Sequence, residues 1–285
     1  MTVAAVVLSW NGREYTLAAL RALEGEDVDT IVVDNASEDG SAEAVEREFA
    51  RADLVRNDRN LGYAGGMNVG IRRALERGAD HVLLLNNDAT VEPGAVAALV
   101  AAADGAAAVC PVIVFAAGGN VWYAGARFDP RRGYNGRHVT QVPDDVAETE
   151  RACGAAMLIP RAAVEAVGPF DEALFAYWED ADWSLRARDA GLPIRVAPRA
   201  RVRHEVSATT GGEGSDTALY YSVRNLLEIG ERYAPLGRLG TWRRTAVIVG
   251  SHAAQALLAG RPGRLRAIAA GWKDFRLGRF GPRPD

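Results

Sequence analysis

Residues 2–12, TVAAVVLSWNG, decide the fold class: an apolar run at 2–8 stops at a polar turn. Short runs of the same kind return at 29–33 (DTIVV), 52–56 and 81–85 (HVLLL). Between the runs, apolar residues at helical spacing predict helices at 13–23, 37–49 (capped by Ser37 or Asp39), 64–77 and 92–103, with Pro93 in the first turn of the last. Strands that are apolar throughout and separated by single helices indicate a parallel sheet covered on both faces. The sequence therefore predicts an α/β fold whose ligands bind at the carboxyl ends of the strands.

The second half of the chain is less regular. Residues 128–150 hold Pro, Gly, Asp, Arg and Asn and are predicted to be a surface excursion, and the Gly/Ser/Thr segment 207–216 is expected to be a mobile loop. Strands are predicted at 109–115, 121–127, 152–159 (antiparallel), 194–196 and 201–204, and helices at 161–167, 180–190 and 217–232.

Composition places the chain among ordinary globular proteins. Its 285 residues are 48% hydrophobic and 25% charged, which excludes a disordered, collagenous or coiled-coil protein. Its two cysteines, Cys110 and Cys153, lack metal-ligand spacing and are interpreted as buried thiols in a reducing compartment. Because we find no secretory signal and no run of about 18 apolar residues, we expect a cytoplasmic protein, or one peripheral on the inner face of the cytoplasmic membrane.

Charge divides the chain into two parts. Residues 1–231 carry 22 basic and 35 acidic side chains, whereas residues 232–285 carry 11 basic and 2 acidic ones. We therefore predict a catalytic domain at 1–231 and a basic helical extension at 232–285. Within the extension, apolar side chains recur at helical spacing between arginines: Leu265, Ile268, Trp272 and Phe275. Such a helix suits an anionic membrane surface, or it packs on the body or on a second subunit, which leaves a homo-oligomer open. Nucleic acid is not an expected partner, because the body is acidic.

Polar residues follow two of the predicted strands in the first part. Asp34 comes directly after a buried strand in VVDNASEDGS (32–41), where it would bind a ribose or a base, or serve only in helix capping. In RNDRNLGYAGGMNVG (56–70), Gly62, Gly65 and Gly66 allow a diphosphate or a sugar to approach the backbone at a helix N-terminus. This spacing differs from the dinucleotide fingerprint, and the alternative is a simple turn.

A third polar strand end lies in LLLNNDAT (83–90). Asn86 and Asp88 stand at alternate positions, and hard oxygen ligands suit Mg²⁺ or Mn²⁺ that bridges a diphosphate. The alternative is that they cap the next helix. His204, in ARVRHE, would complete a metal site with Asp88 or serve a structural role.

Acidic and aromatic residues gather in FDEALFAYWEDADWSLRARDAG (170–191). Glu179, Asp180 and Asp182 begin the predicted helix among Tyr177, Trp178, Trp183 and other aromatic rings. Aromatic rings stack on sugars, carboxylates bind sugar hydroxyls, and aromatic packing raises a carboxylate pKa toward the range of a general base. The alternative is a solvated helix that begins with acids for electrostatic reasons.

Together and in this order, six segments resemble the family-2 glycosyltransferases with a GT-A fold, especially the bacterial rhamnosyltransferase-like branch. The segments are 6–12, 32–41, 56–71, 83–95, 153–191 and 201–205, and the resemblance covers about 2–230. It implies a Rossmann-like, mostly parallel sheet with helices on both faces, here with a C-terminal helical extension. The Gln-x-x-Arg-Trp signature of the processive enzymes is absent.

The resemblance also implies roles for individual residues. Asp180 would be the catalytic base, with Glu179 and Asp182 positioning the acceptor and the helix, and Asp88 would bind the metal, with His204 as a further ligand. Asn86 stands where the family commonly has the first acid of Asp-x-Asp, which removes one charge from the site. The nucleotide-sugar would contact Ser9, Asn11, Asp34, Asn60, Gly62, Gly65 and Asn68, together with Asn86 and Asp88, and the acceptor would contact Tyr177, Trp178 and Trp183.

The implied activity is non-processive, inverting transfer of a sugar in cell-wall or polysaccharide biosynthesis. The donor would be a dTDP- or UDP-sugar, with rhamnose favoured, the cofactor Mn²⁺ or Mg²⁺, and the acceptor a hydroxyl of a glycan or a polyprenyl-linked sugar. A sugar-nucleotide pyrophosphorylase is the alternative enzyme, although its N-terminal Gly-rich triphosphate loop is missing. A non-catalytic nucleotide-sugar binder is the third hypothesis, supported by Asn86.

Overall fold

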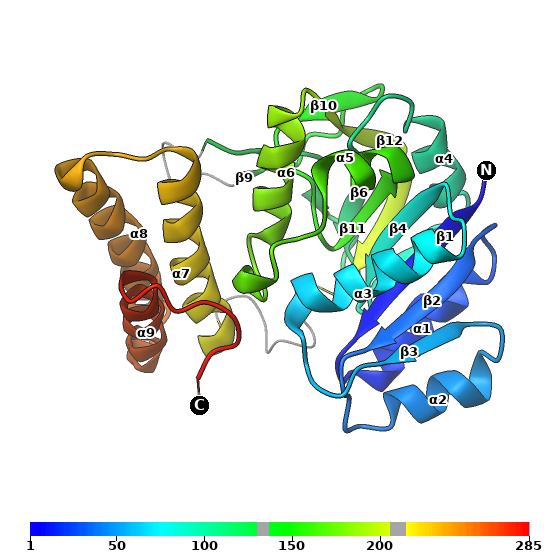
Figure 1. Cartoon of the computed structure of the whole chain (residues 1–285), viewed down its shortest axis with the longest axis horizontal. Coiled ribbons are helices and arrows are strands. Elements are labelled where there is room, and N and C mark those ends of the chain that lie inside the picture. Colours follow the sequence, from blue (N-terminus) through cyan, green and yellow to red (C-terminus); the bar gives the residue numbers. More distant parts are fainter. Residues whose placement is uncertain (130–136, 206–214, 285) are drawn as a thin grey trace.

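The computed structural model describes residues 1–129, 137–205 and 215–284 (Figure 1). Almost all of the predicted loop 207–216 lies outside these ranges. The described part is an α/β domain joined to a group of C-terminal helices. The predicted fold class is therefore confirmed.

One mixed sheet of ten strands forms the centre of the described structure, with eight of them in the order β10-β12-β6-β11-β4-β1-β2-β3. β5 and β7 pair with β12 and β6. The middle strands are buried almost throughout, as their apolar sequences predict. The bounds are β1 Val3–Ser9, β2 Asp29–Asp34, β3 Asp53–Arg56, β4 His81–Asn86, β5 Ala89–Val91, β6 Ala108–Phe115, β7 Val121–Tyr123, β10 Ala147–Thr149, β11 Ala156–Pro160 and β12 Ile194–His204. A separate pair joins β8 Ala126–Arg127 to β9 Arg137–His138.

Strand direction brings the functional segments to one edge of the sheet. β1 runs parallel to β2 and β4, β2 to β3, and β6 to β12. β11 lies antiparallel between β4 and β6, as predicted, so it begins at the edge where its neighbours end. Asp34, Asn86 and His204 therefore lie at the same edge of the sheet. Polar side chains from distant parts of the sequence gather there.

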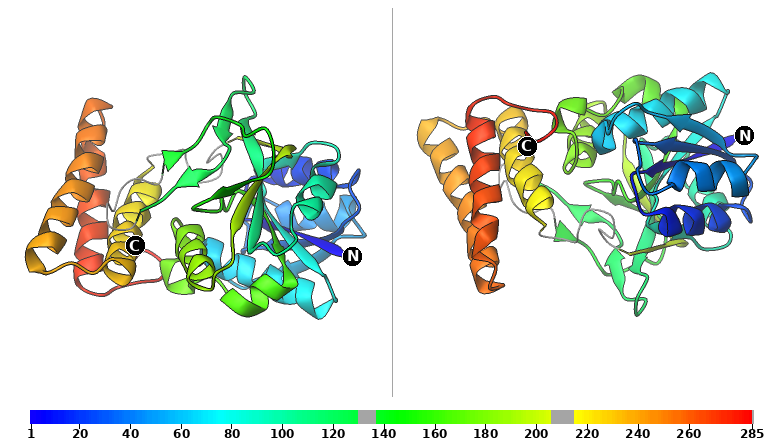
Figure 2. Two further views of the ribbon diagram at one scale, coloured as in Figure 1. Left: turned by 90° about the horizontal axis from the view of Figure 1, so that it is seen from above. Right: turned by 90° about the horizontal axis from the view of Figure 1, so that it is seen from below.

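Helices cover both faces of this sheet. α1 (Arg13–Leu23), α2 (Ser41–Glu48) and α4 (Ala95–Ala101) lie on one face, and α3 (Gly62–Glu76) and α5 (Arg161–Val167) lie on the other (Figure 2). α3 lies close to β1 because it carries glycines where it crosses the strand. A Cβ atom on Gly70 would come within 2.2 Å of Val6 Cγ1, and one on Gly66 within 2.4 Å of Leu8 Cδ1. These two glycines therefore serve helix–strand packing.

Some predicted boundaries were wrong for local reasons. α2 begins at Ser41 after Gly40, which adopts φ 78°, so neither Ser37 nor Asp39 occupies its N-cap. The predicted helix 92–103 is shortened to α4, because the Glu92 N–H still pairs with the Arg201 carbonyl and Gly94, with φ 79°, occupies the N-cap. Residues 194–204 form one long strand instead of two, with an irregularity between Ala197 and Arg201.

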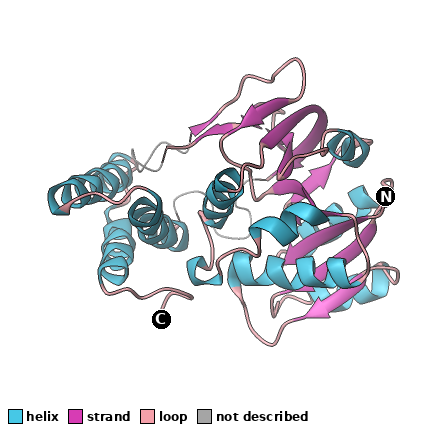
Figure 3. Ribbon diagram, turned by 45° about the horizontal axis from the view of Figure 1, so that its top comes forward, coloured by secondary structure: helices cyan, strands magenta, loops and turns pink. Residues whose placement is uncertain are grey.

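The C-terminal helices build a second core beside the sheet. α7 (Asp216–Tyr233), α8 (Arg238–Leu258) and α9 (Leu265–Arg276) pack together at the far end of the molecule from the N-terminus (Figure 3). α6 (Glu179–Asp189) contributes Ala181 and Leu185 to this core. The division at residue 231 stays a prediction; this residue lies inside α7, which packs closely with α9.

The helix for which the sequence left open membrane contact or packing is α9, and most of its apolar side chains pack on the protein. In α9, Ile268 is buried and Leu265 and Phe275 pack on the core that α7 shares, whereas Trp272 is 40% exposed. The apolar side of α9 therefore faces largely inward, as the packing alternative required. In the part of the chain that the structure describes, no helix has the length and apolarity needed to cross a membrane.

Candidate active site

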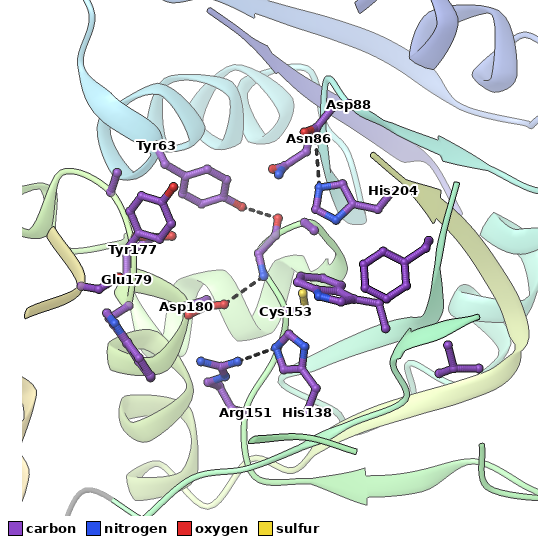
Figure 4. A pocket seen from close by; sticks show the side chains of 18 of the residues that line it. Tyr63, Asn86, Asp88, His138, Arg151, Cys153, Tyr177, Glu179, Asp180 and His204 are labelled. Carbon is purple, nitrogen blue, oxygen red and sulfur yellow. Dashed lines mark hydrogen bonds and ion pairs between the residues drawn. The ribbon is translucent and has the colours of Figure 1, made fainter. Parts of the chain in front are cut away.

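A cavity of about 710 Å³ lies where the edge of the sheet meets the start of α6 (Figure 4). Its walls come from segments far apart in the sequence. Asp88 and Asp180 both line it, at separate places on its wall. Its other polar or aromatic lining residues include Tyr63, Asn86, Trp122, His138, Arg151, Tyr177, Trp178, Glu179 and His204.

Asp88 and His204 form a buried pair at one end of the cavity. His204 Nε2 lies 3.0 Å from Asp88 Oδ1, and both side chains are 5% exposed or less. β5 pairs with the end of β12, so the residue before β5 meets the last residue of β12. Asn86 lines the cavity two residues earlier, and Asn87 turns away to donate from Nδ2 to the carbonyl oxygen of Asn11. Alternation along the strand end thus directs positions 86 and 88 to the cavity.

Asp180 is held at the wall by backbone and helix contacts. Its Oδ2 accepts a hydrogen bond of 3.1 Å from the Gly154 N–H. The Gly154 carbonyl accepts a bond of 2.6 Å from the hydroxyl of Tyr63, which belongs to α3. Ser184 Oγ donates to the Asp180 carbonyl and accepts from the Ala152 N–H. The carboxylate is therefore fixed by segments from both halves of the chain.

Glu179 differs from its neighbour in environment. Its side chain is buried, and Oε2 has no hydrogen-bond partner in the described structure. Burial, together with the charge of Asp180, raises the pKa of Glu179 well above its ordinary value. The site therefore places an acid with a raised pKa beside a carboxylate group that accepts a backbone N–H.

A strained loop sets where α6 begins. Phe175, Tyr177 and Trp178 have φ values of 65°, 66° and 72°, a conformation that costs non-glycine residues of this kind roughly 1–3 kcal/mol each. Asn225 on α7 braces the loop: its Nδ2 lies 2.9, 2.8 and 2.7 Å from the carbonyl oxygens of Leu174, Ala176 and Tyr177. These contacts are buried or partly buried, so they replace solvation that the carbonyls have lost.

Arg224 adds to this support of the loop. Its guanidinium is fully buried, and Nη2 donates to the Leu174 carbonyl at 2.9 Å. Nη1 donates to the carbonyl of Gly281, so the C-terminal segment is tied to the same point. Helix α7 and the C-terminal segment thus hold the loop that presents Tyr177 and Trp178 to the cavity.

Some residues that line the cavity could not be recognised from the sequence. Among them are His138, Arg151 and Trp122, which come from the predicted surface excursion or its surroundings. Arg151 Nη2 lies 2.8 Å from His138 Nε2, and the edge of the Trp122 ring contacts His138 at a centroid distance of 4.5 Å. No motif surrounds them in sequence. Only the pairing of β8 with β9 and of β6 with β7 brings them to the cavity.

The predicted nucleoside residues lie on the same edge but do not line this cavity. Ser9 and Asp34 are paired across β1 and β2, and Asn11 follows in the next turn. Ser9 Oγ lies 3.0 Å from Thr16 Oγ1, and Asn11 Oδ1 accepts from the Glu38 N–H. Asp34 accepts from the Ser37 N–H through Oδ2, while its buried Oδ1 has no partner in the described structure. Their role in nucleotide binding stays a prediction.

Four residues of the predicted sugar cleft make contacts within the protein. Asn68 is buried; its Nδ2 donates to the Phe170 carbonyl and to Glu172, and its Oδ1 accepts from the Phe170 N–H. Asn60 Oδ1 accepts from the Gly62 N–H. A Cβ on Gly62 would lie 2.4 Å from the Phe175 carbonyl, and one on Gly65 would lie 2.9 Å from Leu61 Cβ. The two glycines therefore allow close packing of the chain, and the role of the four residues in nucleotide-sugar binding stays a prediction.

Two residues predicted from the acidic helix also point away from the cavity. Trp183 is buried against Phe170, and its Nε1 donates to the Gly168 carbonyl at 3.0 Å, so it is a core residue and not an acceptor platform. Asp182 is paired with Arg186 and Arg232 and accepts from the Tyr233 hydroxyl. It therefore joins α6 to α7 and does not contact the cavity as a catalytic group. Both cysteines are buried free thiols, as predicted.

The family model "Glycosyl transferase family 2" matches residues 6–168, more than half of the chain. The chain belongs to glycosyl transferase family 2. This family-2 glycosyltransferase is 27% identical over 258 residues to an N-acetylglucosaminyl-diphospho-decaprenol L-rhamnosyltransferase of Mycobacterium tuberculosis, covering 81% of this chain and 82% of that protein. It is 26% identical over 244 residues to the dTDP-rhamnosyl transferase RfbF of Shigella flexneri, with 81% of each chain covered. The chain is therefore rhamnosyltransferase-like.

Solved structures share the fold of the family-2 glycosyltransferase. The crystal structure of GalNAc-T7 with UDP, GalNAc and Mn²⁺ matches 80% of this chain and 48% of that chain, with a TM-score of 0.66 and 18% identity. S. aureus TarS 1–349 in complex with UDP-GlcNAc matches 98% of this chain and 82% of that chain, with a TM-score of 0.59 and 17% identity. The likeness places the α/β domain among GT-A folds.

We predict that Asn225→Ala lowers the transfer rate by about tenfold or more, because small displacements of catalytic groups are costly, while the KM for the donor changes little. Three carbonyls lose a buried partner, so the free energy of unfolding falls by about 1–3 kcal/mol. Steady-state kinetics and urea unfolding measure both effects. Asn120→Ala, at an exposed asparagine, is the control. A destabilised Asn225→Ala protein that retains the full transfer rate would show that the loop does not depend on this amide.

Proposed function

We propose that this family-2 glycosyltransferase transfers a sugar, with rhamnose favoured, from a nucleoside diphosphate donor to a hydroxyl of a glycan or polyprenyl-linked acceptor, with inversion. The observation that carries the proposal is the placement of Asp180 and of the Asp88–His204 pair on one cavity. The activities of two relatives support this choice of donor and acceptor. One relative is a dTDP-rhamnosyl transferase, and the other is an N-acetylglucosaminyl-diphospho-decaprenol L-rhamnosyltransferase.

Asp180 is the proposed catalytic base. Its carboxylate accepts the proton of the acceptor hydroxyl as that oxygen bonds to the anomeric carbon and the bond to the diphosphate breaks. The Gly154 N–H holds one carboxylate oxygen, which leaves the other for the acceptor. Tyr177 and Trp178 line the same end of the cavity and offer ring faces to a sugar. One base on the acceptor side suffices for inversion, so no covalent glycosyl-enzyme is needed.

Glu179 acts beside the base as a hydrogen-bonding group. Burial and the charge of Asp180 raise the pKa of Glu179, which favours its protonated form more than in an exposed glutamate. Its proposed part is to position the acceptor and not to accept the proton.

The Asp88–His204 pair fits a divalent cation. A carboxylate and an imidazole facing one cavity suit Mn²⁺ or Mg²⁺ that takes its other ligands from diphosphate oxygens and water. Within the described ranges there is no group of three or more His, Cys, Asp or Glu side chains that would hold a metal. Asn86 contributes no charge, so the proposed site depends on the nucleotide for its remaining ligands. The ion would neutralise charge on the leaving diphosphate.

An isosteric pair of variants tests the base. Asp180→Asn removes the carboxylate of the proposed base, and we expect transfer to fall by about 10²–10⁴-fold while the nucleotide-sugar still binds. Glu179→Gln keeps the shape of a side chain whose raised pKa favours its protonated form, so transfer stays within about tenfold of the wild type. Transfer of rhamnose from dTDP-rhamnose and calorimetric titration of the donor measure both properties. Near-normal turnover by Asp180→Asn would remove that residue from the role.

A second experiment tests the metal. We expect Asp88→Ala to abolish the gain in dTDP affinity that Mn²⁺ gives the wild type, because the pair loses its charged ligand. Titration calorimetry of dTDP with and without Mn²⁺ measures it. Glu92→Ala, in a partly exposed ion pair with Arg203 at the protein surface, is the control. Equal affinity of the wild type in both conditions would contradict metal assistance.

We also propose that the outer face of α8 contacts the surface of an anionic membrane, which would bring the site to a lipid-linked acceptor. Leu239, Trp242 and Leu258 are 73, 68 and 88% exposed on this helix. Residues 238–258 hold no Asp or Glu, and the exposed Arg238 and Arg243 lie beside the apolar side chains. An exposed apolar helix face with arginines and no acid matches an interface of anionic lipid headgroups.

Vesicle flotation tests this contact. We expect the wild type to float with phosphatidylglycerol vesicles and not with phosphatidylcholine vesicles, and Leu239→Gln/Trp242→Gln to lose at least half of the floating fraction. Val146→Gln, at another exposed apolar residue, is the control. Equal flotation of the double variant and the wild type would contradict the proposal. So would a stable dimer that the double variant dissociates, because the face would then bind a second copy.

A further inference from the structure

The cavity contains a buried cation, Arg151, that forms no ion pair with any carboxylate of the described residues, although its charge acts on nearby Glu179. Arg151 lines the cavity, is 7% exposed, and has no carboxylate within 4.0 Å among the residues that the structure describes. Its Nε is buried without a hydrogen-bond partner in the same part of the chain. Burying a charge is costly unless the charge is paired or bound. An arginine held this way at the wall of a cavity is poised for an anionic ligand.

His138 and Trp178 orient this guanidinium. Burial, together with the charge of Arg151, lowers the pKa of His138 to about 4, so its ring is neutral near pH 7. Its Nε2 therefore accepts a hydrogen bond of 2.8 Å from Arg151 Nη2. On the other side, the guanidinium carbon lies 5.2 Å from the centre of the Trp178 ring. A neutral imidazole and an aromatic face fix the planar fork without cancelling its charge.

Arg151 lies on the Asp180 side of the cavity. Figure 4 shows Asp88 and His204 on one side, and Arg151 and His138 on another, with Asp180 near Arg151. The Trp122 ring contacts both histidines, at centroid distances of 4.5 Å from His138 and 5.1 Å from His204. With the donor diphosphate at Asp88, an anion beside Asp180 and Arg151 would be carried by the acceptor.

We propose that Arg151, positioned by His138, forms a phosphate subsite that binds the phosphate or diphosphate carried by the acceptor. This inference rests on the proposed function and narrows its acceptor to a sugar linked to a phosphate. A planar guanidinium forms paired, charge-assisted hydrogen bonds to phosphate oxygens, which selects this chemistry over a neutral glycan. Trp178, which covers the guanidinium, keeps the subsite next to the acceptor sugar.

Two acceptors that differ only in phosphate test the subsite. The first is N-acetylglucosamine joined to a short alkyl chain through a diphosphate, and the second is the matching alkyl glycoside without phosphate. We expect Arg151→Gln to raise the KM for the diphosphate acceptor by about 10–100-fold and to leave the KM for the glycoside within about twofold. Arg151→Lys keeps the charge but not the fork, so its KM falls between the two. Arg72→Gln, at an exposed arginine of α3, is the matched control.

Circular dichroism and direct titration of dTDP show whether each variant is folded and binds the donor, and Arg72→Gln gives the reference for an exposed arginine. An equal rise in KM for both acceptors would overturn the subsite. A parallel loss of dTDP affinity in Arg151→Gln would also overturn it, because the arginine would then serve the donor. If the wild type uses neither acceptor, the proposed function fails, and direct titration of the diphosphate acceptor decides the subsite: it stands if Arg151→Gln loses binding and falls if both proteins bind equally.

Discussion

The active-site geometry depends on the hold that one asparagine of α7 has on a strained loop. Asn225 donates to carbonyls of Leu174, Ala176 and Tyr177, in a turn that contains three residues with positive φ. Without this support the loop would relax toward ordinary backbone angles, and α6 would begin elsewhere. The first turn of α6 carries both Glu179 and Asp180. Helix α7 therefore supports the wall of the cavity that carries Asp180, although it lies beside the sheet and not on it.

Two parts of the fold position the residues that line the cavity. The first is the sheet, because strands that end at a common edge place Asn86, Asp88 and His204 together without any local motif. The second is the loop that Asn225 holds, since it places Tyr177 and Trp178, and the acids Glu179 and Asp180 that follow, at another wall of the cavity. Gly154 and Tyr63 connect the two walls through hydrogen bonds. Donor and acceptor would thus be oriented by separate parts of the fold that share one cavity.

The sequence predicted the strands, most helices and the residues at strand ends, because apolar periodicity and turn chemistry are local properties. It predicted Asp88, His204 and Asp180 as members of one site, and these three line one cavity. It did not separate residues that face the cavity from residues that face the protein. Asn68, Asp182 and Trp183 have side chains that could bind a sugar, but each lies on a side of its helix that faces the protein, where it bonds to other residues of the chain. His138 and Arg151 lie in a segment without periodicity, and only long-range strand pairing brings them to the site.

The stereochemistry of transfer tests the central claim most directly. The claim is that Asp180 alone acts as base on the acceptor hydroxyl, while the leaving diphosphate is held at Asp88. Transfer should be run with a nucleotide-sugar of known anomeric configuration, and the configuration of the new glycosidic bond read by nuclear magnetic resonance before any product is degraded. The account predicts an inverted anomeric centre throughout the reaction. A product that retains the configuration of the donor would contradict it, because in-line attack by a hydroxyl that Asp180 deprotonates on the acceptor side inverts the anomeric centre.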